Sequence, residues 1–527
     1  MSDVADSPPA SEEGEGRARR QERHRRALLS LLGSNGQKVV RILVAIFFTP
    51  LALGYFGREV YGLWVATAVV LSYSSALMSS VGYAVMTQVA NARGRDSIAE
   101  ITEIFTSTTV GLALVAGVLG AVGSILAAVV PLTGIFGIPV EMEPQARAVL
   151  LVVLWTGVFG VVLGQSVFLQ QAYQEDYFGS LWATLGTVLN LGALAAIVWV
   201  RGDLVHLAIA SGVLLNLIHL LTGLHHWTAH PECRLVLGAF RPQRVLALAA
   251  SGGLFFLTCL RMVVTWNTDS FIVSNRLGAQ EVVSYSVLVQ IAAVLFGILN
   301  GLSTGYWTAY SEAAARQDWD WIRFAVRRVT LFGCSMASAT AVCFYFWGPS
   351  FYALWVPQVE ISRPALLLLA AYLPVVIFIE AHCILLNALS CLKEQVLPAL
   401  VISAFHVAVS LYLIPEYGVA GAAAATLVPD LLIGLVVYPW LVRHKTQGQV
   451  VAPGFRLGGV LALPLLAASL AAWLVRPFLL AWGPVASLVV GPILTLAVYA
   501  ATLLPLLGED AAALRKLGGL FSGRPRT

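Results

Sequence analysis

Long apolar stretches, separated by short polar ones, run along most of this chain. Most of them exceed the roughly 18 residues that make a helix a candidate for crossing a bilayer. The pattern predicts an all-α polytopic membrane protein with about fourteen transmembrane helices. We place these helices near residues 36–56, 61–85, 104–130, 148–170, 178–200, 203–224, 246–274, 282–309, 326–347, 364–388, 396–414, 418–441, 456–475 and 484–507.

Composition supports this class and argues against others. Of the 527 residues, 58% are hydrophobic and only 11% are charged, which is not the balance of a soluble globular domain. The formal net charge of +4 gives no general electrostatic support for nucleic-acid binding. The six cysteines form no CxxC pair and are predicted to be small apolar thiols.

The lysines and arginines are unevenly distributed between the two sides of the predicted helices. With the N-terminus inside, cytoplasmic segments hold 24 of them and external loops hold 6. Because cytoplasmic loops carry the excess of positive residues, we expect both termini in the cytoplasm. The two remaining residues, Arg41 and Arg261, lie inside predicted helices.

These two arginines are the first candidate site. A charge at membrane depth costs roughly 2.5–3.5 kcal/mol on insertion scales, so it usually faces a bundle interior or a wet cavity. Arg41 lies 16 residues before Gly57 and Arg261 lies 17 residues before Gly278, so each half places one arginine on its first helix. We expect one central cationic site within the membrane. The alternatives are that Arg41 snorkels to the interface and that Arg261 forms an internal ion pair.

Three acids within predicted helices add to this picture. Asp269 lies eight residues beyond Arg261, about 12 Å along a helix and some 80° around it, so the two do not pair directly. Asp269 is either a counter-charge for an arginine on another helix or a cap for an unwound turn. Glu380 and Asp430 lie within later helices, where carboxylates mark either cation paths or internal ion pairs. They are our candidates for carrying a coupling H⁺ or Na⁺.

An internal repeat divides the chain. Residues 82–93 (GYAVMTQVANAR) and 305–316 (GYWTAYSEAAAR) share Gly, Tyr, two Ala and the closing Arg. Six helices in each half imply two bundles related by an axis along the membrane normal, with sites at their interface. We predict a disordered cytoplasmic tail (1–27), an N-terminal bundle (28–224), a cytoplasmic linker (225–245), a C-terminal bundle (246–445), an appended helix pair (446–507) and a basic cytoplasmic tail (508–527).

Several of these stretches resemble a known family. The segments GYFGREVYGLWVATAVV (54–70), NTDSFIVSNRLGAQEVVSYSV (267–287), LLNALSCLKE (385–394) and EYGVAGAAAATLVPDLLIGLVVYP (416–439) are similar to bacterial polysaccharide flippases. These are the O-antigen, Wzx-type members of the multidrug/oligosaccharidyl-lipid/polysaccharide (MOP) exporter superfamily. The resemblance covers most of residues 30–445 and implies a MATE-like fold. Glu380 and His382 are departures from the family pattern.

The resemblance implies a bacterial inner-membrane flippase for polyprenyl-diphosphate-linked oligosaccharide, used in lipopolysaccharide, O-antigen or exopolysaccharide assembly. Arg41 and Arg261 would bind the diphosphate because guanidinium groups match phosphate oxygens, and Asp269 would complete the substrate site. Membrane lipid would hold the polyprenyl tail, and a glycan polymerase and glycosyltransferases are candidate partners. The alternative is a cation-coupled multidrug antiporter of the same fold.

An enzyme is the third class to consider, and the motifs argue against it. Asp318-Trp319-Asp320 matches a glycosyltransferase DxD, but its loop is too short for a nucleotide-binding domain. His225, His226, His230 and Cys233 offer zinc ligands at a spacing that fits no standard site, so a histidine-rich interface loop is the preferred interpretation. No GxSxG, P-loop or HExxH pattern occurs. We predict no catalytic residue, no metal and no cofactor.

Overall fold

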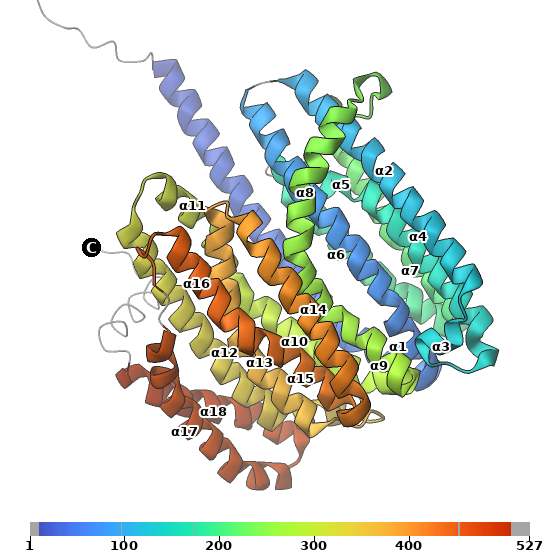
Figure 1. The fold of residues 1–527 in the computed structure, drawn as a ribbon, viewed down its shortest axis with the longest axis vertical. Coiled ribbons are helices and arrows are strands. Elements are labelled where there is room, and N and C mark those ends of the chain that lie inside the picture. Colours follow the sequence, from blue (N-terminus) through green and yellow to red (C-terminus); the bar gives the residue numbers. More distant parts are fainter. Residues whose placement is uncertain (1–9, 96, 174, 452–453, 507–527) are drawn as a thin grey trace, which may run out of the picture. The chain divides into compact units, whose positions relative to one another are not determined.

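The computed structural model of this chain describes residues 10–95, 97–173, 175–451 and 454–506, and these are helical almost throughout (Figure 1). Thirteen helices in these ranges are long and apolar enough to cross a membrane. The predicted all-α, multi-pass class is confirmed. The chain divides into two compact units, Met1–Phe256 and Leu257–Thr527, which are described separately below.

The first unit is built around five long helices and the first part of a sixth. Its α2, α4 and α7 lie side by side, and α6 packs on α1. The elements are α1 (Ala10–Gly94), α2 (Ile98–Val129), α3 (Leu132–Phe136), η1 (Val140–Met142), α4 (Glu143–Leu163), α5 (Gln165–Ala172), α6 (Asp176–Val200), α7 (Leu204–Ala229), η2 (Pro231–Cys233), η3 (Leu237–Ala239) and the start of α8 (Pro242–Val263).

The second unit contains a larger set of packed helices, with α13 at its centre. That helix contacts α10, α11, α12, α15 and α16. The elements after α8 are η4 (Val264–Thr268), α9 (Asp269–Leu277), α10 (Ala279–Thr304), α11 (Trp307–Ala315), α12 (Trp319–Trp355), α13 (Arg363–Ala388), α14 (Leu392–Tyr417), α15 (Val419–Pro429), η5 (Asp430–Gly434), α16 (Leu435–Lys445), α17 (Gly454–Ala481) and α18 (Pro484–Leu506).

A glycine breaks the first apolar span. The span Gly36–Arg93 has 58 residues, and a straight helix of that length would be about 87 Å long, far more than the ~30 Å hydrocarbon core. Gly57 interrupts it with φ 75° and ψ 173°, a conformation open only to glycine at low cost. Gly278 has nearly the same angles, φ 94° and ψ 163°. The two glycines that follow Arg41 and Arg261 at nearly equal spacing therefore share one backbone conformation.

The N-terminal stretch differs from the prediction. Residues 1–27 were expected to be disordered, but α1 already begins at Ala10, and only residues 1–9 of that stretch lie outside the described part. The sequence from 10 to 27 is rich in Glu, Arg and Ala, all strong helix formers, and it continues directly into an apolar helix that can extend it. The predicted C-terminal tail, 508–527, also lies outside the described residues.

The predicted linker 225–245 packs closely against the first unit. Its 3₁₀ turns η2 and η3 lie on α2, and α2 side chains hydrogen-bond to its backbone. These bonds join Thr102 to the Glu232 carbonyl (2.8 Å), the Val236 N–H to Thr106 (3.1 Å) and the Arg241 N–H to Ser107 (3.0 Å). Arg244 then forms ion pairs with Glu103 and Glu100 of α2.

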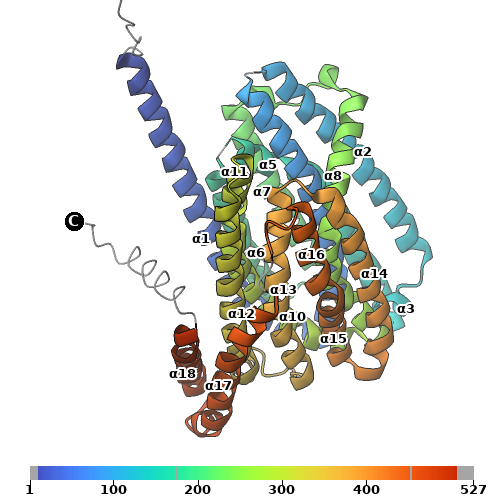
Figure 2. The same cartoon turned by 60° about the vertical axis from the view of Figure 1, so that its left-hand side comes forward.

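The last two helices pack on the second unit through α12. Both α17 and α18 contact α12 and each other, and they lie beside it in both views (Figures 1 and 2). The buried Trp347 of α12 donates a hydrogen bond from Nε1 to Thr495 of α18 at 2.9 Å. Gly491 makes the approach possible, because an added Cβ there would lie 2.5 Å from the Trp347 ring.

Candidate functional site

The second unit buries an arginine between two carboxylates. Arg261, at the end of α8, is 2% exposed. Its Nη1 donates to Asp430 Oδ2 at 2.8 Å, and its Nη2 donates to Glu380. The three residues come from α8, α13 and η5, so this arginine triad (Arg261, Glu380 and Asp430) ties three helical segments together. Of the alternatives for Arg261, the structure has the internal ion pair.

Two tyrosines complete the surroundings of the triad. The Tyr372 hydroxyl donates to Asp430 Oδ2 at 3.0 Å, and the guanidinium carbon of Arg261 lies 5.6 Å from the centroid of the Tyr438 ring. Asp430 Oδ1, by contrast, has no hydrogen-bond partner among the described residues, although it is buried. One carboxylate oxygen of the triad is therefore available to a proton or a small cation.

The local sequence explains why Asp430 reaches this position. Pro429 has no N–H to donate, and the helix changes from α to a π-helical turn, η5, directly after it. Gly434 closes that turn. An added Cβ at Gly434 would lie 2.6 Å from Ile379 and 3.0 Å from Asp430 Oδ1, so glycine keeps space open at the unpaired oxygen.

Asp269 holds a second buried polar cluster. Its carboxylate is 0% exposed and accepts hydrogen bonds from the Ser410 hydroxyl (2.6 Å), the Tyr285 hydroxyl (3.1 Å) and the Thr426 hydroxyl (3.3 Å). His406 Nε2 lies 3.0 Å from Asp269 Oδ1. We call these five residues the aspartate node. Among the described residues its partners are hydroxyls and an imidazole, and no arginine is one of them.

The triad and the node connect the same two helical segments. Arg261 and Asp269 flank η4, a π-helical turn, while Thr426 of α15 lies one turn before Asp430, the first residue of η5. Single π-helical turns inside α-helices are rare and occur frequently at functional sites. Two such turns therefore lie beside two buried charge clusters, which makes this part of the second unit the best candidate for a functional site.

Carboxyl groups outnumber basic groups in the two clusters. Arg261 and His406 accompany three carboxyl groups, Asp269, Glu380 and Asp430, of which only Glu380 is measurably exposed, at 13% of its side chain. Burying an unbalanced charge is costly, so a group in this position takes up a proton or pairs with a cation. Groups of this kind are suited to taking up a proton or a small cation.

Arg41 lies on α1 in the first unit, and its side chain is exposed. It belongs to a different unit from Arg261, and a cavity shared by the two arginines stays a prediction. The sequence singled out Arg261, Glu380 and Asp430 separately, and the structure brings these three together. It also adds His406 and Tyr372, which sequence reasoning did not select.

Comparisons with known proteins agree with this fold. Residues 255–415 match the MatE family model. The solved structure of the lipid II flippase MurJ, in an inward closed conformation, superposes with a TM-score of 0.72 at 13% identity, covering 92% of this chain and 99% of that chain. The chain therefore shares the fold of this solved transporter. A multidrug resistance MATE family transporter of the MOP superfamily, in an inward-facing conformation, gives 0.63 at 14% identity, with 78% and 99% covered.

One curated relative carries a functional name. It is the "Putative O-antigen transporter" of Salmonella typhimurium, 22% identical over 151 residues, a match that spans 28% of this chain and 35% of the relative. The sequence resemblance to MOP-superfamily flippases is confirmed at the level of the fold and the MatE segment. These proteins are transporters, and this chain is a multi-pass membrane protein of the same architecture.

Proposed function

We propose that this chain flips polyprenyl-diphosphate-linked oligosaccharide from the cytoplasmic to the outer leaflet of a bacterial inner membrane. The observation that carries the proposal is the extent of the fold likeness: MurJ covers 92% of this chain, against 78% for the MATE transporter. The O-antigen name of the curated relative supports the same substrate class. Both termini would lie in the cytoplasm, and the glycan would serve polysaccharide assembly.

The proposed transport cycle is alternating access. The sugars and the diphosphate enter a hydrated cavity while the polyprenyl tail stays in lipid, and rocking of the two halves then opens the cavity to the outside. Arg41 supplies one guanidinium for the diphosphate from the first unit. A glycan polymerase and glycosyltransferases would act after and before this step.

Arg261 enters this cycle through its carboxylate partners. In the present conformation Glu380 and Asp430 already neutralise it, so its charge alone does not require an anionic cargo. We propose that a coupling H⁺ or Na⁺ binds these carboxylates and releases the guanidinium, which then binds the diphosphate. Asp269 would keep the segment that carries Arg261 in place, since its node fixes α9 to α10, α14 and α15.

A cation-coupled multidrug antiporter is the second candidate. It is favoured by the match of residues 255–415 to MatE and by the excess of carboxyl groups over arginine in the buried clusters. Such a pump would carry cationic drugs, and it would not need an exposed Arg41.

The decisive experiment uses proteoliposomes with a fluorescent polyprenyl-diphosphate sugar in both leaflets and a membrane-impermeant quencher outside. The wild-type protein should make the inner pool accessible, and Arg261→Ala should abolish this while still inserting, at a temperature below the lowered melting point expected for loss of this arginine. Arg276→Ala, which changes an exposed arginine on α9, is the matched control and should transport normally. Absence of flipping by the wild type, together with efflux of a cationic dye, would favour the antiporter.

A further inference from the structure

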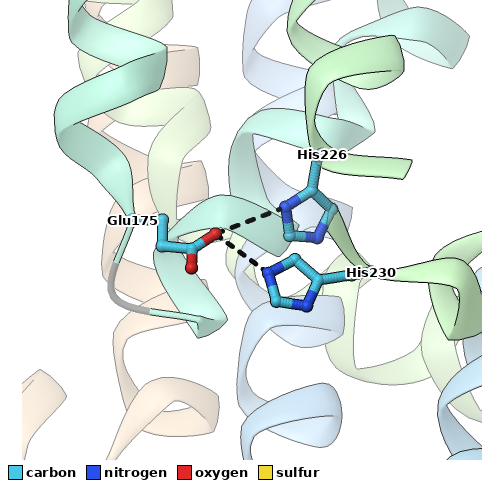
Figure 3. Close-up of side chains that lie close together, drawn as sticks. All are labelled: Glu175, His226 and His230. Carbon is cyan, nitrogen blue, oxygen red and sulfur yellow. Dashed lines mark hydrogen bonds and ion pairs between the residues drawn. The ribbon is translucent and has the colours of Figure 1, made fainter. Parts of the chain in front are cut away.

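Three potential metal ligands meet at one end of the first unit. Glu175 precedes α6, His226 lies in the last turn of α7, and His230 follows α7 (Figure 3). Figure 3 shows the Glu175 carboxylate facing both rings from one side, with a dashed line to each. Its Oε2 lies 3.0 Å from His230 Nε2 and 3.9 Å from His226 Nδ1, and one ligand atom from each residue lies within 4.8 Å of the others.

These separations suit a tetrahedral ion. Zinc bonds of about 2.0–2.2 Å to nitrogen and oxygen place neighbouring ligand atoms about 3.3 Å apart in a tetrahedron. The spacings of 3.0 and 3.9 Å lie on either side of that value, so side-chain rotations alone can adjust them.

The His226 ring nitrogens lack hydrogen-bond partners in the described structure. This residue is 1% exposed. A buried polar group normally has such a partner, and leaving it without one costs about 1–3 kcal/mol. A metal bound to its Nδ1 would satisfy one of these nitrogens and explain why a histidine occupies this position.

The surroundings supply support for bound imidazoles. Metal-binding histidines usually donate their second ring N–H to a carboxylate or carbonyl, which fixes the tautomer. His230 Nδ1 lies 3.5 Å from Glu232 Oε1, and Glu232 accepts a hydrogen bond from the Tyr173 hydroxyl at 2.8 Å. The Tyr173 ring in turn contacts both imidazoles, with centroids 5.1 and 4.1 Å away.

We propose that Glu175, His226 and His230 bind one divalent transition-metal ion, with zinc as the first candidate. Imidazole nitrogens suit zinc, copper and nickel, and a His₂Glu set leaves a fourth position for water. On sequence alone, His225, His226, His230 and Cys233 are candidate zinc ligands, but a histidine-rich loop without a metal is the preferred interpretation. Glu175 was missing from that set because it lies 51 residues before His226 along the chain.

The bound ion would add a further link between three elements. It would tie the start of α6, the end of α7 and the first residues of the segment that runs along α2. The proposal stands on this local geometry and does not depend on which substrate the protein moves.

The test is zinc binding by the full-length protein in detergent, purified with a tag that contains no histidines and treated with a chelator first. Titration calorimetry and elemental analysis should both give one zinc per chain. His226→Ala should abolish this binding, and Glu232→Gln should weaken it about 10–100-fold, the usual effect of losing a supporting carboxylate. His444→Ala, which removes an exposed histidine in the second unit, should bind like the wild type.

Hydrogen exchange of the wild-type protein, measured with and without zinc, tests the proposal without any variant that could misfold. Zinc should slow backbone exchange around residues 226–233 and leave α16 unchanged. The proposal would be overturned by a wild-type protein that binds no zinc, by binding that survives His226→Ala, or by equal loss in His444→Ala.

Discussion

Replacing Arg261 by methionine should destabilise the second unit strongly. The guanidinium is 2% exposed and Asp430 is 1% exposed, so the change leaves two carboxyl groups unpaired in the protein interior. Removing one partner of a buried ion pair typically costs about 3–5 kcal/mol. With about 2 °C lost per kcal/mol in a unit of this size, we expect a melting temperature about 6–10 °C lower.

Replacing the two acids by uncharged residues should offset the stability lost in Arg261→Met. Glu380→Gln alone keeps an acceptor for Arg261 and leaves a neutral Arg261–Asp430 pair, so its cost should be about 1 kcal/mol or less. The triple variant Arg261→Met with Glu380→Gln and Asp430→Asn contains no charge at this position. It should recover most of the loss, because a buried ion pair can often be replaced by uncharged groups at little cost.

The assay is thermal unfolding of the purified variants in one detergent, followed by size-exclusion chromatography after heating. All four proteins are compared at the same heating rate, so that irreversibility affects them equally. The reasoning would be refuted if Arg261→Met melted with the wild type, or if Glu380→Gln lost as much as Arg261→Met. A triple variant no better than the single one would show that shape, and not charge, decides the cost.

Two other substitutions test the helices around this site. Gly278→Ala places a side chain at φ 94°, which should cost about 1–3 kcal/mol; the same heating assay measures it, and an unchanged melting temperature would contradict the need for glycine. Asp269→Asn leaves one carbonyl oxygen where the carboxylate now has four partners, and we expect a loss of at least about 1.5–3 kcal/mol. Unfolding of Asp269→Asn at the wild-type temperature would mean that the node contributes little.

The apolar pattern was enough to predict the helical class and most of the spans. Whether a segment can cross a bilayer depends on its length and its charge content, and both are properties of the local sequence. The N-terminal stretch was predicted differently. Residues 10–27 are polar, and this composition favoured disorder, but they are also rich in helix formers and the structure has them in α1.

The pairing within the candidate site could not be predicted in the same way. Arg261 is 119 residues from Glu380 and 169 from Asp430, so their contact depends on how three helices pack and rotate. The intramembrane charge rule selected each of them but gave no partner. His406 was overlooked because a single histidine in an apolar helix is unremarkable. Its spacing of four residues from Ser410, which places both on one helix face, was the available signal.

The binding of the 229–244 stretch to α2 has a mechanical consequence. A loose tether would absorb any twist between the parts of the chain that it joins, but this stretch has its backbone fixed at Glu232, Val236 and Arg241. The chain then leaves α2 directly as the continuous helix α8, which carries Arg261 near its far end. No loop therefore separates the fixed stretch from the buried guanidinium, and a helix is stiffer than a loop.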